Sequence, residues 1–380
     1  MINKGWLAFF ATLILIGILG ISAIITKGHG VYGTTDYVPW GILISTYVFF
    51  VVTSTGLCLI SSLGHVFGIQ PFAMIAKRAV MLAIITLLAG FAVIGLEVGN
   101  PLKFIYIVLS PNFSSPIFWM GAMYSLYLVL MLAEFYYLSI DDHQKSRFIG
   151  LTAFAVAIIA HSNLGAVFGF LHARPFWEGP YLPIYFIVSA LLSGTAILIV
   201  MFYLKERGSE ESPIIPALSK LLMLFIGISI FFSVWKILSG VYGHPHGKYE
   251  AVQALFNGPL SWSFWTFEVG LGMVAPVVIL LLNRGRTALF AASSLILIAI
   301  FFMRFNLIVA GQIVPLEMID TVAAAGVYHS YRPSWAELAI VAGAFGFTGF
   351  TYLLSEEKMD LDEEEQDSIP FTATHGKYEG

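Results

Sequence analysis

The sequence predicts an all-α polytopic membrane protein of about ten transmembrane helices, built as two parallel-repeat four-helix bundles with two flanking helices. Hydrophobic residues make up 58% of the 380 residues and charged residues only 11%, against about 25% charged in a soluble domain. Apolar runs of membrane-spanning length recur along the chain. This composition excludes a soluble enzyme and a disordered protein. A formal net charge of −4 offers no basic field for nucleic acid.

Ten apolar runs of about 20 residues each predict the membrane helices. They cover about 6–26, 41–66, 73–97, 115–139, 147–171, 180–204, 215–240, 259–283, 286–311 and 335–354. The first run is longer than the apolar core of a signal peptide and no clear cleavage site follows it, so we expect a retained helix.

Basic residues are biased toward one set of loops, which sets the expected orientation. These loops carry Lys4, Lys77, Arg78, Lys145, Arg147, Lys205, Arg207, Lys220, Arg284 and Arg286, whereas the opposite loops carry Lys27, Lys103, Arg174, Lys248 and Arg332. We therefore expect a multi-pass membrane protein with both termini in the cytoplasm. Seven tryptophans lie toward the outer side: Trp40, Trp119, Trp177, Trp235, Trp262, Trp265 and Trp335. An interfacial belt explains tryptophans in general, but the asymmetry favours a docking surface outside, where the loops are long.

Matching residues at an offset of 138 to 143 indicate an internal repeat. Tyr47 precedes Gly56 as Tyr185 precedes Gly194, and the pair Asn163-Leu164 recurs as Asn306-Leu307. Such repeats also occur in transporters, so the repeat does not select a function.

We expect a first flanking helix and outer loop (1–36), a first bundle (37–178), a second bundle (179–312), an outer loop and tenth helix (313–354) and an acidic cytoplasmic tail (355–380).

Intrinsic metal cofactors are not expected. The chain has one cysteine, Cys58, which excludes a cysteine-ligated iron–sulfur cluster and a c-type haem site. His65 and His161 are the histidines within the spans, and their expected depths differ by about 21 Å. They cannot share a b-type haem iron.

A quinone site needs an apolar slot, hydrogen-bond donors and a group that exchanges a proton. Histidine suits the exchange because its pKa is near neutral, and a carboxylate in apolar surroundings can assist it. We expect His161 and Glu97 to be catalytic. The expected quinone-binding residues near the outer surface are Tyr37, Trp40, Asn100, Asn163 and Arg174. The alternatives are a buried histidine bonded to a neighbouring helix, a solvated rim carboxylate, and packing, capping or loop-anchoring roles for the others.

Further ionisable residues within the spans suggest a proton path, because charge inside a bilayer is costly. The candidates are His65, Glu134, Lys236, Glu268 and Arg304. A structural ion pair in a second bundle that binds no quinone explains the last three better. Solvation at the interface explains His65 and Glu134.

The chain resembles the NrfD/PsrC family, the quinone-interacting membrane subunits of prokaryotic respiratory complexes. The segments that carry the resemblance are Pro39-Trp40-Gly41 through Gly56, His161 to Gly169, Arg174-Pro175-Phe176-Trp177 through Pro183, Gly311-Gln312 and Pro333-Ser334-Trp335-Ala336-Glu337. Ten spans and the Arg-Pro-Phe-Trp stretch are most similar to the longer branch, which includes DsrP, HmcC and the ActC/ActF subunits.

The resemblance implies a subunit without metal cofactors of its own that binds menaquinone or menaquinol non-covalently near the outer surface. It also implies an extracytoplasmic ferredoxin-like iron–sulfur partner, further membrane and cytochrome subunits, and a place in anaerobic respiration or sulfur metabolism. A family-like histidine maps onto His161. The aspartates that some members use for proton transfer have no match within the spans, which puts proton translocation in doubt.

Two other functions remain open from the sequence. A secondary transporter explains the repeat and the buried charges, although prolines lie mostly at span ends, with Pro276 as the main exception. A structural membrane anchor of a redox complex explains the spans and predicts no bound quinone.

Overall fold

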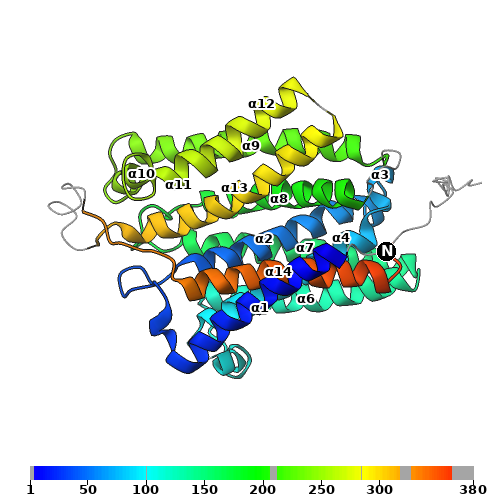
Figure 1. Ribbon diagram of the computed structural model, residues 1–380, viewed down its shortest axis with the longest axis horizontal. Coiled ribbons are helices and arrows are strands. Elements are labelled where there is room, and N and C mark those ends of the chain that lie inside the picture. Colours follow the sequence, from blue (N-terminus) through cyan, green and yellow to red (C-terminus); the bar gives the residue numbers. More distant parts are fainter. Residues whose placement is uncertain (1–3, 100, 206–211, 284, 317–326, 362–380) are drawn as a thin grey trace, which may run out of the picture.

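The computed structural model describes residues 4–99, 101–205, 212–283, 285–316 and 327–361, and this part of the chain is helical without strands (Figure 1). Ten helices within it are long and apolar enough to cross a membrane. The prediction of an all-helical polytopic membrane protein is confirmed.

The ten membrane-length helices are α1 Lys4–Lys27, α2 Ile42–His65, α4 Ala76–Glu97, α6 Pro116–Ser139, α7 His143–Gly169, α8 Tyr181–Lys205, α9 Ile215–Val241, the composite helix Ser261–Leu282, α13 Arg286–Ile313 and α14 Trp335–Lys358. Shorter helices connect them: η1 His29–Val31, α3 Gln70–Ala73, η2 Pro101–Ile105, α5 Tyr106–Leu109 and α10 Lys248–Phe256.

The long helices lie roughly parallel to one axis, so the bundle has two ends (Figure 1). One end carries Trp40, Glu97 and Trp335, and we call it the Trp40 end. The other carries His65 and Lys77, and we call it the Lys77 end. The connections that include α5 and α10 gather at the Trp40 end, whereas α3 and the start of α1 lie at the Lys77 end.

Two expected spans differ in detail. The run 73–97 is divided, because α3 ends at Ala73 and α4 begins at Ala76. The run 259–283 consists of α11 Ser261–Ser263, the π-helix η3 Phe264–Val274 and α12 Ala275–Leu282. Pro276 has no N–H to donate, and its ring would clash with the carbonyl of Gly272 in a regular α-helix. The wider π-helical turns relieve that clash, and such turns are rare in proteins.

Helices α2 and α8 form the centre of the bundle. α2 packs against α4, α7 and α8, and α8 packs also against α7, α9 and α13. We call α2, α4, α6 and α7 the first unit, and α8, α9, the composite helix and α13 the second unit. Corresponding helices make corresponding contacts, since α2 packs on α7 as α8 packs on α13. The domain boundaries expected from the sequence stay a prediction.

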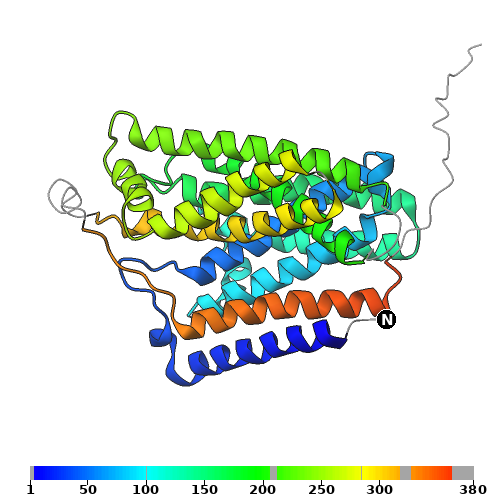
Figure 2. The ribbon, with the colours of Figure 1, turned by 45° about the horizontal axis from the view of Figure 1, so that its top comes forward.

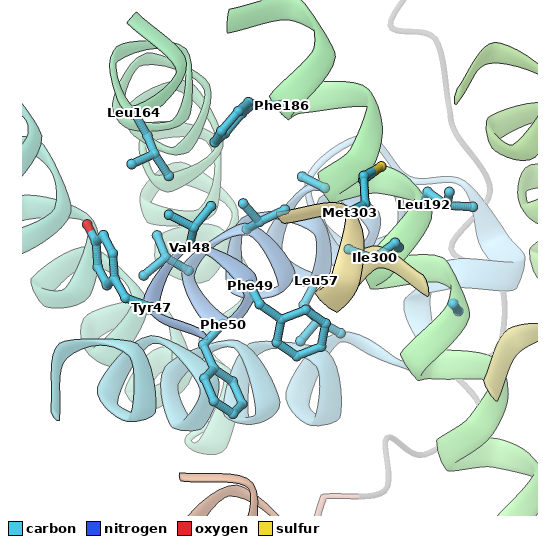
Figure 3. Packing of buried hydrophobic residues seen from close by; sticks show 14 of the residues in the cluster. Tyr47, Val48, Phe49, Phe50, Leu57, Leu164, Phe186, Leu192, Ile300 and Met303 are labelled. Carbon is cyan, nitrogen blue, oxygen red and sulfur yellow. The ribbon is translucent and has the colours of Figure 1, made fainter. Parts of the chain in front are cut away.

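Two glycines set the spacing of the central pair. A Cβ atom on Gly56 would overlap the backbone of α8 at Ala190, and one on Gly194 would overlap the backbone of α2 at Gly56. Small residues allow membrane helices to approach this closely, and close approach increases their van der Waals contact. Figure 3 shows the apolar packing around this pair, with Tyr47, Val48, Phe49, Phe50 and Leu57 of α2 near Phe186 and Leu192 of α8 and Ile300 and Met303 of α13.

The flanking helices α1 and α14 lie side by side along one flank of the bundle (Figure 2). Gly17 faces Gly343, where a Cβ atom on either would come within 2.6 Å of the opposite Cα. α14 also packs on α4 and α2. It therefore links α1 to the first unit.

Gly56→Ala should destabilise the protein, because the added methyl group overpacks the contact between α2 and α8 at a cost of about 1–3 kcal/mol. Gly227→Ala is the matched control, since a Cβ atom there meets nothing within 4 Å. Alanine is the better helix former, so the control should be as stable as the wild type or slightly more so. Thermal unfolding in detergent measures both. Equal midpoints for the two variants contradict this packing.

Candidate functional site

His161 lies inside the first unit, with both ring nitrogens bonded to neighbouring helices. The side chain is fully buried. Nε2 lies 3.0 Å from the carbonyl oxygen of Phe186 on α8, and Nδ1 lies 3.0 Å from the hydroxyl of Tyr124 on α6. A carbonyl only accepts hydrogen bonds, so Nε2 carries the proton in the neutral ring and Nδ1 accepts from Tyr124. The contacts therefore assign one tautomer to His161.

Small residues bring the helices around His161 together. α7 carries Ala153, Ala157 and Gly165, all buried, on the turns before and after His161. A Cβ atom on Gly165 would come within 2.6 Å of Pro183 Cα on α8. This close approach places the imidazole beside the backbone of α8. Along the axis of α7, His161 lies about 12 Å from the end of the helix at Gly169.

Aromatic rings connect His161 to the Trp40 end. The rings of Trp40 and Trp177 stack with centroids 5.5 Å apart, and Phe168 meets Trp177 edge to face at 5.3 Å. Phe186 lies 5.9 Å from Phe168 and also 5.9 Å from His161. These four aromatic residues form a continuous apolar path from the Trp40 end to the imidazole.

Trp40 and Arg174, two residues that the sequence predicts to bind quinone, both form hydrogen bonds with Gln312. The Gln312 side chain accepts from the backbone N–H of Trp40 and donates to its carbonyl. The Arg174 guanidinium donates to the Gln312 carbonyl at 3.1 Å, and partial burial lowers its pKa. Arg174 therefore anchors its loop to the end of α13, the role that the sequence left open as an alternative.

Glu97, the last residue of α4, has a buried carboxylate oxygen, Oε2, that accepts no hydrogen bond. Tyr32 lies beside it and donates to the carbonyl of Leu96 at 2.9 Å. Burial raises the pKa of Tyr32, and the nearby charges of Glu97 and Glu337 raise it further. The unpartnered oxygen makes Glu97 an available acceptor for a hydroxyl or a water molecule.

Glu337 is a fully buried carboxylate that the sequence analysis did not select. It accepts from the backbone N–H groups of Gly33 and Ser334 and from the hydroxyl of Tyr331. The spacing Ser334-x-x-Glu337 is that of a capping box and predicts this pair at the start of α14. Glu337 therefore holds the two loops beside Glu97 in place.

The remaining quinone-site candidates occupy separate positions. Tyr37 is 64% exposed and stacks on His329 at 4.2 Å. The Asn163 amide donates to the carbonyl of Pro116 at 2.8 Å and so joins α7 to the first residue of α6. Asn100 lies outside the described residues. In the part of the chain that the structure describes, no hydrogen bond or ion pair joins Glu97 to His161.

The second unit contains a buried ion pair at the π-helix. Lys236 on α9 donates to Glu268 on η3 at 3.0 Å, and the Asn306 amide donates to the other oxygen of Glu268 at 3.0 Å. Ser263 donates to Asn306 at 2.8 Å. Both oxygens of Glu268 are thus occupied, and the charges of Lys236 and Glu268 compensate each other.

A small cavity of about 30 Å³ lies next to this pair, lined by Glu268, Ser229 and Ser233 among mostly apolar side chains of α8, η3 and α13. The hydroxyls of Ser229 and Ser233 are buried and have no protein partner. A cavity of about 30 Å³ has room for a water molecule beside these polar groups.

Arg304 is fully buried on α13. Its guanidinium lies 4.3 Å above the Phe186 ring, and Nη2 donates to the Ser189 hydroxyl. Nε and Nη1 have no hydrogen-bond partner. Across the described ranges, no carboxylate lies within ion-pair distance of Arg304.

His65 and Glu134 form a buried pair near the Lys77 end. His65 Nε2 lies 2.6 Å from Glu134 Oε1, and their side chains are 8% and 1% exposed. His65 Nδ1 also contacts the carbonyl of Ser61, and Gly150 of α7 packs over the pair. The two groups are therefore not solvated at the interface, which was the alternative left open by the sequence.

Within the described ranges, no three His, Cys, Asp or Glu side chains are placed to hold a metal ion.

Comparison with known proteins identifies the family. A family model described as polysulphide reductase, NrfD matches residues 30–316. The chain belongs to this family. It is 22% identical to a selenate reductase subunit of Mesobacillus selenatarsenatis, with 99% of this chain and 98% of the relative covered. It is 28% identical to the Hdr-like menaquinol oxidoreductase integral membrane subunit of Archaeoglobus fulgidus, over 88% and 89% of the two chains. It is 20% identical to the menaquinone reductase integral membrane subunit of Nitratidesulfovibrio vulgaris, over 87% and 85%.

Lys236→Met should destabilise the protein by up to about 3–5 kcal/mol, because it leaves Glu268 buried without its cation. The double substitution Lys236→Met/Glu268→Met should recover most of the loss, since apolar side chains of similar size need no polar partner. Lys220→Met, at an exposed position of the same helix, is the control and should change little. Thermal unfolding in detergent compares the three. A single variant as stable as the control would show that the pair is not held as described.

Proposed function

We propose that the chain is the quinone-exchanging membrane subunit of a respiratory redox complex. It exchanges electrons between a menaquinone pool and an iron–sulfur subunit docked at the Trp40 end. The Trp40 end then faces the outside of the prokaryotic cytoplasmic membrane, and both termini lie in the cytoplasm. Support comes from the family and from relatives named as menaquinol oxidoreductase and menaquinone reductase membrane subunits.

The observation that carries the proposal is the bonded pair Tyr124–His161 at the inner end of an aromatic path from the Trp40 end. The pair supplies a titratable imidazole and a hydroxyl that relays its proton. The unpartnered oxygen of Glu97 supplies an acceptor for a quinol hydroxyl. An apolar ring with two oxygens needs these kinds of groups, so the residues present fit a quinone.

The roles of the side chains follow from their contacts. Because Nε2 of His161 is bonded to the Phe186 carbonyl, a proton enters or leaves the ring at Nδ1, through Tyr124. Trp40 and Phe168 exclude water from the approach to the pair, which strengthens its electrostatic interactions. A quinone, when bound, supplies the two-electron chemistry. The protein orients the ring and transfers the protons.

The secondary transporter and the structural membrane anchor each explain fewer of the observed contacts. A transporter needs helices interrupted at the substrate site, and the π-helix at Glu268 is the described feature nearest to such an interruption. It lies in the second unit, where the adjacent cavity has a volume of only about 30 Å³. A purely structural anchor gives no role to the unpartnered oxygen of Glu97.

His161→Ala should reduce quinol-linked turnover of the assembled complex by about 10²–10⁴, the usual effect of losing a proton-transfer group. His143→Ala, at the exposed first residue of the same helix, is the matched control and should retain wild-type turnover. Oxidation of a quinol analogue, normalised to the amount of assembled complex, measures the effect. Wild-type turnover in the His161 variant would contradict the proposal.

The iron–sulfur partner should cross-link to the Trp40 end. A photoreactive residue at Tyr242, which is 87% exposed, should capture that partner. The same residue at Ile140, 52% exposed near the Lys77 end, should not. Mass spectrometry of the adducts identifies the captured chain. Capture only from Ile140 would reverse the proposed electron path.

A further inference from the structure

The end of α13, residues 307–312, belongs to the second unit but contacts two aromatic residues that adjoin the first. The segment Gly311-Gln312 is one of those that carry the family resemblance. The contacts reach Trp40, which precedes α2, and Trp177, which follows α7. These two rings form the outer part of the aromatic path. The end of α13 therefore lies against the entrance of that path.

The Gln312 side chain clamps the backbone of Trp40. It is 1% exposed, and its amide oxygen accepts from the N–H of Trp40 at 3.0 Å. Its amide nitrogen donates to the carbonyl of Trp40 at 2.9 Å and to the carbonyl of Ile308 at 2.8 Å. Because a backbone N–H only donates and a carbonyl only accepts, these contacts fix the orientation of the amide. Neither an apolar side chain nor a carboxylate can make the same set of contacts.

Trp177 is seated in a notch at the same end of α13. Its indole N–H donates to the carbonyl of Leu307 at 2.7 Å, and its side chain is buried. A Cβ atom on Gly311 would overlap the indole ring. The ring stacks on that of Trp40 with an interplanar angle of 18°. One helix end thus holds both members of the stack, Trp40 by its backbone and Trp177 by its ring.

We propose that Gly311 and Gln312 are positioning residues for the quinone site. Gln312 fixes the place of Trp40 and Gly311 that of Trp177, so the stacked pair lines the entrance of the aromatic path in one arrangement. The second unit thereby shapes a quinone site whose proton-exchanging residues belong to the first. This inference rests on the proposed function, because it requires the quinone to approach along this path.

The expected effect of this arrangement is on quinone binding. A surface that is already ordered binds more tightly, because no loop or side chain has to be immobilised when the ligand arrives. Arg174 also donates to the Gln312 carbonyl, so the segment after α7 is tied to the same point. Gly311 and Gln312 carry no group that exchanges a proton at neutral pH. Their loss should therefore weaken binding and leave the chemical step intact.

The test compares two variants of the assembled complex. Gln312→Met removes both hydrogen bonds to Trp40, and Gly311→Ala places a methyl group against the ring of Trp177. Anaerobic oxidation of menadiol, a naphthoquinol without an isoprenoid tail, gives kcat and KM. Near-ultraviolet circular dichroism reports on packed indole rings, and the change caused by Trp40→Phe identifies the contribution of the stacked pair.

Each variant has a matched control. Gln144→Met lies at an exposed position near the start of α7, and Gly227→Ala adds a Cβ atom that meets nothing within 4 Å. Both controls should keep the wild-type KM and spectrum.

We expect Gln312→Met and Gly311→Ala each to raise KM roughly two- to tenfold, the size of effect expected for one aromatic contact. The value of kcat should stay close to the wild type, because a raised KM at unchanged kcat indicates lost binding and not lost chemistry. Both variants should also lose the part of the spectrum that Trp40→Phe removes.

The outcomes separate this inference from the proposed function. If His161→Ala oxidises menadiol at the wild-type rate, the proposed function fails and this inference fails with it. If His161→Ala is inactive while either variant keeps the wild-type KM, only the inference is overturned, and a lower unfolding temperature in that variant then assigns a structural role. A spectrum that retains the Trp40 contribution in Gln312→Met also overturns it. If Gln312→Met does not assemble, the KM and spectrum of Gly311→Ala decide.

Discussion

The backbone contact between α2 and α8 at Gly56 and Gly194 is the constraint on which the interior depends. α8 is the one described helix that packs against α2, α7, α9 and α13. Once its distance from α2 is fixed, its turn Phe186–Ser189 lies between the helices that carry His161 and Arg304. The same turn then accepts a hydrogen bond from each side. Close helix packing thus produces the polar geometry at the centre of the protein.

A membrane interior offers no water, so buried polar groups must find partners within the protein. Three sets of partners lie in the described interior: Tyr124 with His161, Lys236 with Glu268 and Asn306, and the ion pair of His65 with Glu134. The exceptions are informative because an unpartnered buried group is costly. The buried groups without a protein partner include Oε2 of Glu97, the hydroxyls of Ser229 and Ser233, and Nε and Nη1 of Arg304.

Hydropathy predicted the ten spans, because they depend on the order of apolar residues along the chain. It did not predict the partners, because these depend on how each helix is rotated and on what it crosses. Tyr124 was missed although Tyr127, Met131 and Glu134 share its buried face of α6. The π-helix at Glu268 was missed because it depends on a local clash at Pro276 and leaves no hydrophobic signature. Glu337 was predictable in principle from its capping box.

Photoaffinity labelling with a menaquinone analogue in native membranes tests the central claim most directly, because it locates the quinone without depending on turnover. The account predicts labelled peptides from α2, α4 and α6 near the Trp40 end, protected by excess menaquinone and reduced by substitution of Glu97. Protectable labelling confined to the second unit, around Glu268 and its cavity, would contradict it.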